Sequence, residues 1–265
     1  TEYEIPKRDW SSDVCSSDLG DRYVSPRDFI WNDNDPLDLD GHGTHVTGTI
    51  GQLTNNSQGA AGMAFNVRIM PVKVIDSIWD DIFGSPFQGT DDVVARGMHY
   101  AVDNGAKVLN LSIGRTGPPS PLLQEALIYA TSRGAFVSIA AGNDFEDGNP
   151  VEWPASYANG IAGAVAVGAI GRDRAHAYYS SAGPYVEVVA PGGNQRSGGT
   201  QGGIVQQTFD FSVVETYNNG PAQYRAPRFD VFSYQFFQGT SMAAPHVSGF
   251  AALLYQDRKS TRLNS

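Results

Sequence analysis

The central part of the chain alternates between amphipathic stretches and short apolar runs. Residues 91–104 carry apolar or small side chains at positions 93, 94, 97, 98, 101 and 102, the spacing of one helix face, and Asn104-Gly105 suits the C-terminal end of that helix. A second helix is predicted over 121–133, with Pro121 in its first turn and Gly134 after its end. Further apolar runs predict strands over 67–75, 107–113, 135–141, 164–170 and 186–190.

Strands that alternate with helices indicate a parallel sheet with helices on both faces. We therefore expect an α/β fold of three layers, α/β/α, around a central, mostly parallel sheet, with ligand sites at the carboxyl ends of the strands. The stretch 192–238 is rich in Gly and Gln and then aromatic. It predicts a surface insertion that ends in an apolar strand over 231–237.

Length and net charge limit the classes of protein to which the chain can belong. The 265 residues suit one large domain. The formal net charge of −10 argues against nucleic acid as a partner. No apolar run is long enough to span a membrane. The single cysteine, Cys15, offers no disulfide within the chain.

The two ends of the chain look like opposite-strand translations of one DNA string. Residues 257–265 (DRKSTRLNS) can be written as GATCGGAAGAGCACACGTCTGAACTCC, and the reverse complement, shifted by one base through an added T at its start, reads as residues 10–18 (WSSDVCSSD). Both segments resemble translated sequencing-adapter DNA, and the alternative is a Ser/Asp-rich loop and a basic tail. We therefore expect residues 1–19 to be unassignable, residues 20–256 to form an N-terminally truncated domain, and residues 257–265 to be an adapter-like tail.

Three motifs place a base, an amide and a nucleophile in that order along the chain. Residues 239–246 (GTSMAAPH) put Ser241 on a Gly-led turn where a helix is predicted from 241 to about 255, and free N–H groups at a helix start stabilise an oxyanion or acyl ester. Residues 40–48 (DGHGTHVTG) supply His42 as a base. Residues 140–143 (AAGN) end an apolar run with the amide of Asn143. Outside this context, Ser241 would be interpreted as a helix cap and Asn143 as a turn residue.

At these motifs the chain resembles the subtilisin-like serine proteases (subtilases, peptidase family S8) of the secreted bacterial type, over roughly residues 28–256. The resemblance implies a serine endopeptidase in which Ser241 attacks the peptide carbonyl, His42 moves the proton, and Asn143 binds the oxyanion. It also implies an aspartate, on a strand before His42, that orients the imidazole. No Asp between residues 20 and 40 follows an apolar strand. The rival interpretation is a catalytically inactive subtilisin-like domain that only binds.

The resemblance also assigns substrate and metal ligands. Ser112, Ile113 and Gly114 correspond to the edge on which a peptide substrate pairs as an added strand, and the alternative is a plain strand end. Glu152 stands two residues before Pro154, at the floor of the primary specificity pocket. With Asp144 near the pocket mouth, Glu152 predicts a preference for Lys or Arg before the cleaved bond. The alternative is that Glu152 points to solvent or pairs with an arginine, Arg172 or Arg174.

The loop over 54–59 resembles the calcium loop of the family, with Thr54, Asn56 and Gln58 as tentative ligands of a structural calcium ion. The acidic run over 32–38 is expected to be a solvated loop, with a second cation site as the alternative. His42 and His45 form an H-x-x-H pair, but a zinc protease needs H-E-x-x-H. We therefore expect His45 and His246 to be buried structural residues with paired nitrogens. The family implies an extracellular, monomeric enzyme with protein or peptide substrates, no nucleic acid and no membrane.

Overall fold

The computed structural model describes residues 22–57, 59–76, 89–210, 213–215, 223–226 and 228–263. The predicted adapter-like segment with Cys15 and the tentative calcium ligand Gln58 lie outside these residues. None of the helices within the described ranges is long and apolar enough to cross a membrane.

A four-stranded parallel sheet forms the middle layer. Its strand order is β3-β4-β5-β6, and each neighbouring pair is parallel. The strands span Val108–Leu111 (β3), Phe136–Ala140 (β4), Ala164–Ile170 (β5) and Val186–Pro191 (β6). The predicted strands over 107–113, 135–141, 164–170 and 186–190 are therefore confirmed, with shorter ends at β3 and β4.

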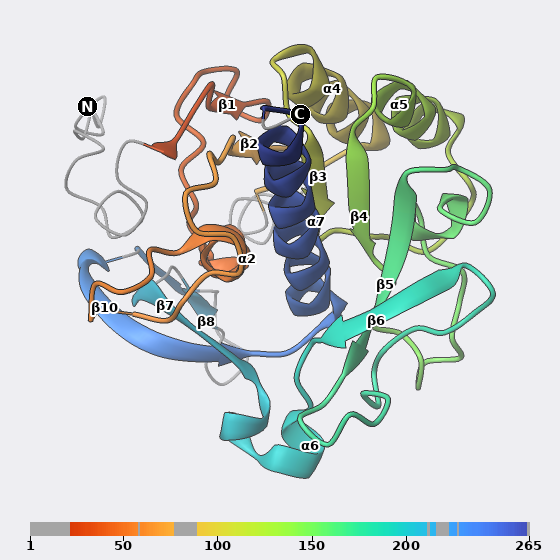
Figure 1. Ribbon diagram of the computed structural model, residues 1–265. Coiled ribbons are helices and arrows are strands. Elements are labelled where there is room, and N and C mark those ends of the chain that lie inside the picture. Colours follow the sequence, from red (N-terminus) through yellow and green to blue (C-terminus); the bar gives the residue numbers. More distant parts are fainter. Residues whose placement is uncertain are drawn as a thin grey trace.

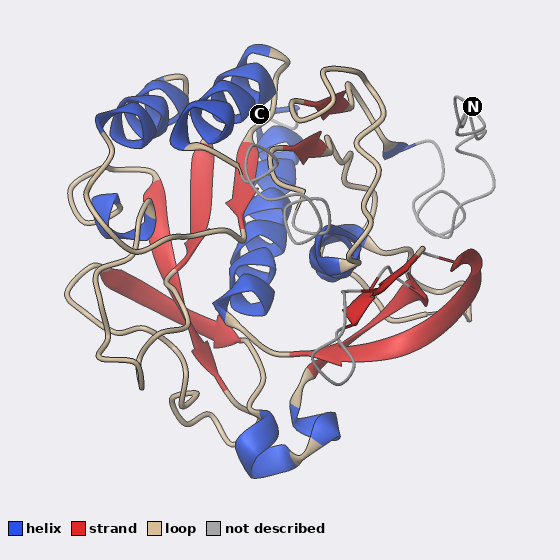
Figure 2. Cartoon of the chain, turned by 180° about the vertical axis from the view of Figure 1, so that it is seen from behind, coloured by secondary structure: helices blue, strands red, loops and turns tan. Residues whose placement is uncertain are grey.

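Alternate residues of the sheet face two different helical layers, because successive side chains of a strand point to opposite faces. Val137 and Ile139 of β4 are fully buried in one cluster with residues of helices α4 (Asp91–Asp103) and α5 (Pro121–Ser132). Ser138 points the other way, and its hydroxyl donates to the carbonyl of Ala244 in helix α7 (Thr240–Leu263) at 2.9 Å. Helices thus cover both faces, which confirms the three-layer α/β/α fold (Figures 1 and 2).

A second, smaller parallel pair lies beside the main sheet. Strand β1 (Arg27–Asp28) pairs with β2 (Val72–Lys73), and Tyr23 forms an isolated parallel bridge with Ile69. The strand predicted over 67–75 is therefore much shorter than expected. In Figure 1 this pair lies on the β3 side of the main sheet.

The stretch 192–238 is folded more extensively than a surface insertion. It contains α6 (Gln195–Gly198), η4 (Thr200–Gly202), β7 (Ile204–Asp210), β8 (Val213–Glu215), β9 (Gln223–Arg225) and β10 (Arg228–Phe237). Strands β7 and β10 are antiparallel, and β7 packs against helix α2 (His42–Gly51). The predicted strand over 231–237 is confirmed within β10. The expectation of a mere surface segment was wrong, because the buried amide of Gln206 donates to Thr49 of α2 at 3.3 Å.

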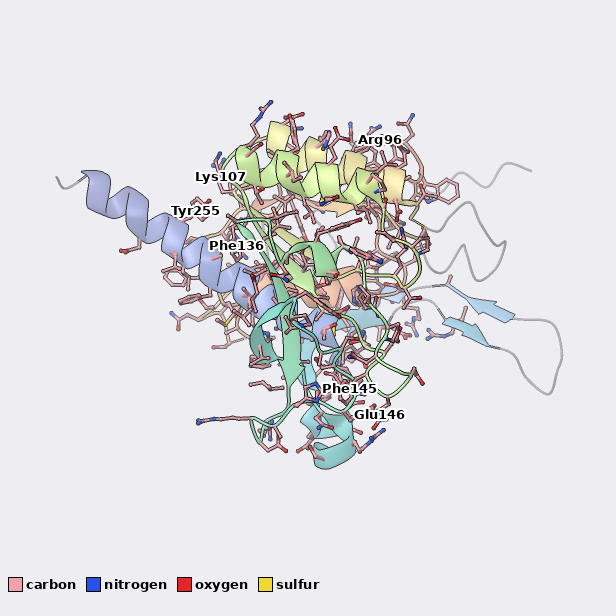
Figure 3. The ribbon with its side chains drawn as sticks, turned by 90° about the vertical axis from the view of Figure 1, so that its right-hand side faces the viewer. Arg96, Lys107, Phe136, Phe145, Glu146 and Tyr255 are labelled. Atoms are coloured by element: carbon pink, nitrogen blue, oxygen red, sulfur yellow. The ribbon has the colours of Figure 1, made fainter. Side chains whose placement is uncertain are left out.

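Helix α7 starts at Thr240 and continues well past the predicted end near residue 255. It includes backbone from the adapter-like tail, up to residue 263. Figure 3 shows these last turns projecting away from the rest of the molecule beyond Tyr255. Because extending an existing helix needs no new nucleus, helical backbone here carries no information on the origin of the tail. A short 3-10 helix, η3 (Ala155–Tyr157), follows the cis peptide bond between Trp153 and Pro154.

Candidate active site

The three residues predicted to carry chemistry line one pocket of about 410 Å³. They are His42, Asn143 and Ser241, and they come from the start of α2, the loop after β4 and the start of α7. The other lining residues are Gln195, Phe237, Gln238 and Met242. The convergence agrees with the expectation that functional residues gather at the carboxyl ends of the parallel strands and at the helix starts beside them.

Ser241 lies in the first turn of α7, where the backbone N–H groups have no partner within the helix. The turn before it needs glycine, because Gly239 has a φ of 152°. The Ser241 hydroxyl donates to the carbonyl of Ser112 at 3.3 Å, and the Ser112 hydroxyl donates to the carbonyl of Ser241 at 2.7 Å. This reciprocal pair fixes the start of α7 against the carboxyl end of β3.

The amide of Asn143 is held in one orientation by Thr240. Its Oδ1 accepts from the backbone N–H of Thr240 at 2.9 Å and lies 3.1 Å from the Thr240 hydroxyl oxygen. Thr240 is fully buried, and its hydroxyl also accepts from the N–H of Gly142 at 3.1 Å. The Asn143 oxygen is thus occupied, which leaves the NH₂ group as the donor toward the pocket. No role for Thr240 was predicted from the sequence, although it stands within the motif directly before Ser241.

His42 opens α2, next to Gly41, which has a φ of 76°. Burial lowers the pKa of its imidazole below the ordinary value, and the Asp40 carboxylate partly opposes this. A lowered pKa keeps the ring neutral near pH 7, the form that accepts a proton. Among the described residues, the ring has no hydrogen-bond partner, and the Asp40 carboxylate accepts instead from the backbone N–H of His42 at 2.9 Å.

Asp38 anchors the same helix start and is not merely part of a solvated loop. Its carboxylate accepts from the N–H of Gly41 at 3.1 Å and from both the N–H and the hydroxyl of Thr44 at 2.7 Å. Burial, followed by the nearby Asp40 carboxylate, raises the pKa of Asp38 to about 6. The sequence analysis missed this cap, for which an Asp shortly before a helix was the available signal.

Glu152 is buried beside the expected substrate edge. A Cβ built on Gly142 would lie 2.3 Å from Glu152 Cγ, and one built on Gly114 would lie 3.3 Å from Glu152 Oε2. The side chain therefore fills the space between the segments around Asn143 and Ser112. Glu152 is 4 % exposed and forms no ion pair among the described residues, so the alternatives of solvent or an arginine partner are wrong. Burial, and then the Asp144 carboxylate, raises the pKa of Glu152 to about 7.

The segment Ser112–Ile113–Gly114 leaves β3 next to this glutamate. The next residue, Arg115, forms an antiparallel bridge with Trp153. The backbone N–H of each residue donates to the carbonyl of the other, at 2.9 Å in both cases. The described structure thus places Gly114 beside Glu152, and Ser112 beside Ser241. The pairing of a peptide substrate along this edge stays a prediction.

His45 and His246 lie in surroundings typical of histidines with a structural role. His45 is fully buried, stacks on Phe237 with ring centroids 4.4 Å apart, and its Nε2 lies 3.0 Å from the carbonyl of Ile204. The Nδ1 of His246 lies 2.8 Å from the carbonyl of Met242. Burial lowers the pKa of both rings, that of His45 to about 4. One nitrogen of each ring is paired, which supports structural roles, but the buried Nδ1 of His45 has no hydrogen-bond partner among the described residues, so the expectation of paired nitrogens is met only in part.

The tentative calcium loop is described only in part. Thr54 and Asn56 are half-buried, and the loop turns through left-handed residues Asn55 and Ser57. These residues offer neutral oxygen atoms and no carboxylate, whereas calcium is usually held by carboxylates as well. In the parts of the chain that the structure describes, no group of three or more His, Cys, Asp or Glu side chains is arranged so that it could hold a metal ion. The described loop alone does not fit a calcium site, so calcium stays a prediction from the resemblance.

Comparison with known proteins gives a consistent result. Residues 11–264 match the family described as "Subtilase family". The chain is 37% identical over 252 residues to a thermophilic serine proteinase from Bacillus sp. (strain AK1), covering 95% of this chain and 51% of that protein. It is 36% identical over 244 residues to thermitase from Thermoactinomyces vulgaris, covering 92% of this chain and 71% of that protein. The chain thus spans about half the length of the first relative.

Solved structures agree with the sequence comparison. A protease from Pseudoalteromonas arctica PAMC 21717 superposes with a TM-score of 0.71 at 32% identity, covering 93% of this chain and 75% of that one. A cold adapted subtilisin-like serine proteinase superposes with a TM-score of 0.64 at 30% identity, covering 93% of this chain and 73% of that one. On its motifs, its three-layer fold and these matches, the chain belongs to the subtilase family of serine proteases.

Proposed function

We propose that this domain is a serine endopeptidase that cleaves peptide bonds through an acyl-enzyme. The observation that carries the proposal is the single pocket in which His42, Ser241 and the NH₂ group of Asn143 meet. A nucleophile, a neutral base and a fixed amide donor are the groups that acyl transfer requires.

The steps follow from these positions. Ser241 Oγ attacks the carbonyl carbon of the substrate while its proton passes to His42. The oxyanion that forms is held by Asn143 Nδ2 and by the backbone N–H of Ser241. The C–N bond then breaks, and the leaving amine takes the proton from His42. Water hydrolyses the acyl ester, again with His42 as the base, and restores the Ser241 hydroxyl.

The second candidate is a catalytically inactive binding domain of the same fold. One specific observation favours it, since no described carboxylate accepts a hydrogen bond from the His42 ring. An imidazole without that partner is not held in the reactive tautomer. We therefore expect the chain as printed to be nearly inactive, and a restored aspartate strand to make it a protease.

We propose further that the domain acts as a monomer on proteins or peptides outside the cell, without nucleic acid or membrane as partners. The resemblance to secreted bacterial subtilases supports the location. The formal net charge of −10 supports solubility there and disfavours nucleic acid.

The test needs one engineered protein, called here the strand-restored version. In it, residues 10–20 are replaced by an apolar strand that ends in Asp-Thr-Gly. It should hydrolyse an unfolded protein substrate, lose activity on treatment with a fluorophosphonate, and keep activity with a zinc chelator. Activity that survived the fluorophosphonate but vanished with the chelator would contradict the proposal.

The orientation of Asn143 leads to a prediction. In the strand-restored version, Asn143→Ala should lower kcat by about 10²–10³, the loss known for this donor in subtilisin, with little change in KM. Thr240→Val should lower kcat less, because it removes only the hydroxyl contact and leaves the backbone N–H. The measurement is steady-state hydrolysis of a chromogenic peptide. A rise in KM alone would show that Asn143 merely binds substrate.

The buried Glu152 leads to a prediction about specificity. We expect acceptance of Lys or Arg immediately before the cleaved bond. Because its pKa is raised to about 7, Glu152 is largely neutral below that pH and charged above it. The ratio of kcat/KM for Lys over Leu at that position should therefore rise between pH 6 and pH 8, by up to about tenfold for a single new charge.

The control for this prediction is Glu152→Gln, which keeps the shape of the side chain and removes the titration. In the strand-restored version, the pH dependence of the Lys/Leu ratio should disappear with this variant. A preference for large apolar residues by more than tenfold in both proteins would show an ordinary apolar pocket.

A further inference from the structure

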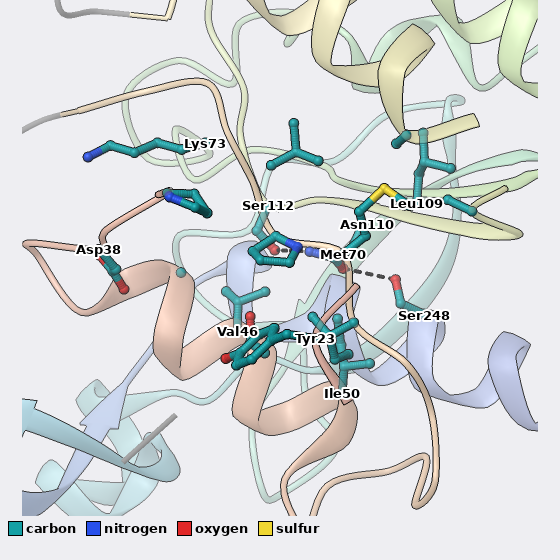
Figure 4. Close-up of a pocket in the computed structure, with 18 of the residues that line it drawn as sticks. Tyr23, Asp38, Val46, Ile50, Met70, Lys73, Leu109, Asn110, Ser112 and Ser248 are labelled. Atoms are coloured by element: carbon teal, nitrogen blue, oxygen red, sulfur yellow. Dashed lines mark hydrogen bonds between the residues drawn. The ribbon is translucent and has the colours of Figure 1, made fainter. Parts of the chain in front are cut away.

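The two sides of the proposed active site come from different parts of the fold. On one side, a chain of hydrogen bonds holds the carboxyl end of β3 (Figure 4). Ser248 of α7 donates to Asn110 Oδ1 at 2.9 Å, and Asn110 Nδ2 donates to the Ser112 hydroxyl at 2.9 Å. This side leads to the predicted substrate edge at 112–114, which takes the acyl part of the peptide. The opposite side, called here the leaving side, is then available for the residues beyond the cleaved bond.

The leaving side is formed by the stretch 192–238. Gln195 opens α6, Phe237 ends β10 and Gln238 follows it, and all three line the pocket that contains the nucleophile. With Met242 they contribute two amides, a phenyl ring and a thioether, and none of these side chains is charged. Recognition of a substrate residue on this side therefore depends on hydrogen bonds and apolar contact and not on an ion pair.

The amide of Gln195 is held in one orientation. Its Nε2 donates to the carbonyl of Phe236 at 2.8 Å, and because a carbonyl oxygen only accepts, the NH₂ group must lie at that end. The backbone N–H of Gln195 donates to Gln238 Oε1 at 2.7 Å, and Gln238 Nε2 donates to the Tyr178 hydroxyl at 2.7 Å. Both ends of the Gln238 amide are thus engaged. Gln195 Oε1 has no hydrogen-bond partner among the described residues, so it is the acceptor that the leaving side offers.

The next residue, Arg196, joins this segment to the loop that follows Asn143. Its Nη1 and Nη2 donate to the two carboxylate oxygens of Glu146 at 2.5 and 2.7 Å. Its guanidinium carbon lies 3.6 Å from the centre of the Tyr178 ring. Both charged side chains are at least half exposed, and such a pair adds little to stability. A bidentate pair does fix geometry, however, so Arg196 positions Gln195 relative to the loop of the oxyanion donor.

From this geometry we infer that Gln195 determines specificity on the leaving side, where its Oε1 accepts a hydrogen bond from the side chain of the first residue after the cleaved bond. A fixed acceptor favours a side chain with a donor, such as that of asparagine, over a hydrocarbon chain of the same size. It disfavours an ionised aspartate, which carries only acceptors. The effect on hydrolysis rests on the proposed function, whereas binding of the leaving fragment itself needs no catalysis.

The binding test uses the full chain as printed and three C-terminally amidated fragments, Asn-Ala-Ala, Leu-Ala-Ala and Asp-Ala-Ala, which stand for the leaving product. Each fragment is titrated into the isotope-labelled chain, and the NMR signal of the Gln238 backbone amide gives Kd. The Asn fragment should bind about three- to tenfold more tightly than the Leu fragment, as one net hydrogen bond predicts, and the Asp fragment should bind most weakly. In Gln195→Met, which keeps the length of the side chain without its polar atoms, the Asn and Leu fragments should bind equally.

Arg196→Met tests the positioning of α6. It should lower the ratio of the Asn and Leu affinities about twofold, because the ion pair with Glu146 is lost. The matched control is Arg96→Met, since Arg96 also forms an exposed ion pair, with Asp92 at 3.1 Å, and lies 5.4 Å from the centre of the Phe29 ring. Figure 3 shows Arg96 and Glu146 at opposite ends of the molecule. The control should leave the ratio unchanged, and an equal loss in both variants would contradict the role of Arg196.

Equal binding of the three fragments, a preference for Asn that persists in Gln195→Met, or no saturable binding of any fragment would overturn the inference. Hydrolysis by the strand-restored version separates it from the proposed function. Peptides with Asn or Leu after the cleaved bond should differ in kcat/KM by about the same three- to tenfold factor. Hydrolysis with equal kcat/KM for both would leave the protease function intact and contradict the role of Gln195. If the fragments bind as described and neither peptide is hydrolysed, the leaving-side site stands and the proposed protease function fails.

Discussion

The strand-restored version with Asp at the end of its new strand is expected to hydrolyse peptides about 10⁴-fold faster than a matched version with Asn at that position. The expected factor follows subtilisin, where loss of the aspartate alone lowers kcat by about 3 × 10⁴. The physical reason is that the aspartate holds the imidazole in the tautomer that accepts the serine proton. His42 has no such partner among the described residues, since Asp38 and Asp40 bond to backbone groups at the start of α2.

The measurement is kcat on one chromogenic peptide for three proteins, namely the Asp version, the Asn version and the chain as printed. The Asn version and the printed chain should both be close to background. Similar rates in all three would mean that His42 works without a carboxylate, and the expectation of low activity for the printed chain would be wrong.

Loss of either Ser241 or His42 should be the most damaging single change in the site. In the strand-restored version, Ser241→Ala and His42→Ala should each lower kcat by about 10⁶, as the corresponding losses do in subtilisin. The double variant should be hardly worse than either single one, because both residues act in the same proton-coupled attack. The measurement is kcat for the two single variants and the double variant. Additive losses would contradict a shared step.

Ser112→Ala is the matched control for Ser241→Ala. Ser112 is also a serine at the carboxyl end of the sheet, and its hydroxyl donates to the Ser241 carbonyl at 2.7 Å. Its loss should reduce activity modestly by loosening the start of α7, with no change in mechanism. A larger loss of activity from Ser112→Ala than from Ser241→Ala would indicate that Ser112, and not Ser241, is the nucleophile.

The sequence predicted the elements whose pattern is local. Helices α4 and α5 follow from apolar spacing and from their end residues, and β5 matches its apolar run at both ends. The resemblance of their motifs to the subtilases implied that His42, Asn143 and Ser241 meet in one place, in agreement with the rule that functional residues gather at the carboxyl ends of parallel strands. These features depend on nearby residues or on topology, both of which can be inferred from a chain.

The sequence did not predict features that depend on tertiary contacts. The Gly- and Gln-rich composition of 192–238 suggested a surface segment, yet Gln206 and Thr208 are buried where β7 packs against α2. The orientation of the Asn143 amide depends on Thr240, which is adjacent only in space. The resemblance placed Glu152, two residues before Pro154, at the expected specificity pocket, but its burial follows from two glycines, Gly114 and Gly142, that leave room for its side chain.

In the proposed mechanism, Ser241 is the nucleophile and His42 activates it. The most direct test is to treat the strand-restored version with a fluorophosphonate, digest it, and map the adduct by mass spectrometry. We expect one adduct, on Ser241, that forms slowly or not at all in His42→Ala and is absent from Ser241→Ala. An adduct on Ser112 or another serine, or full peptide hydrolysis without any adduct, would contradict it.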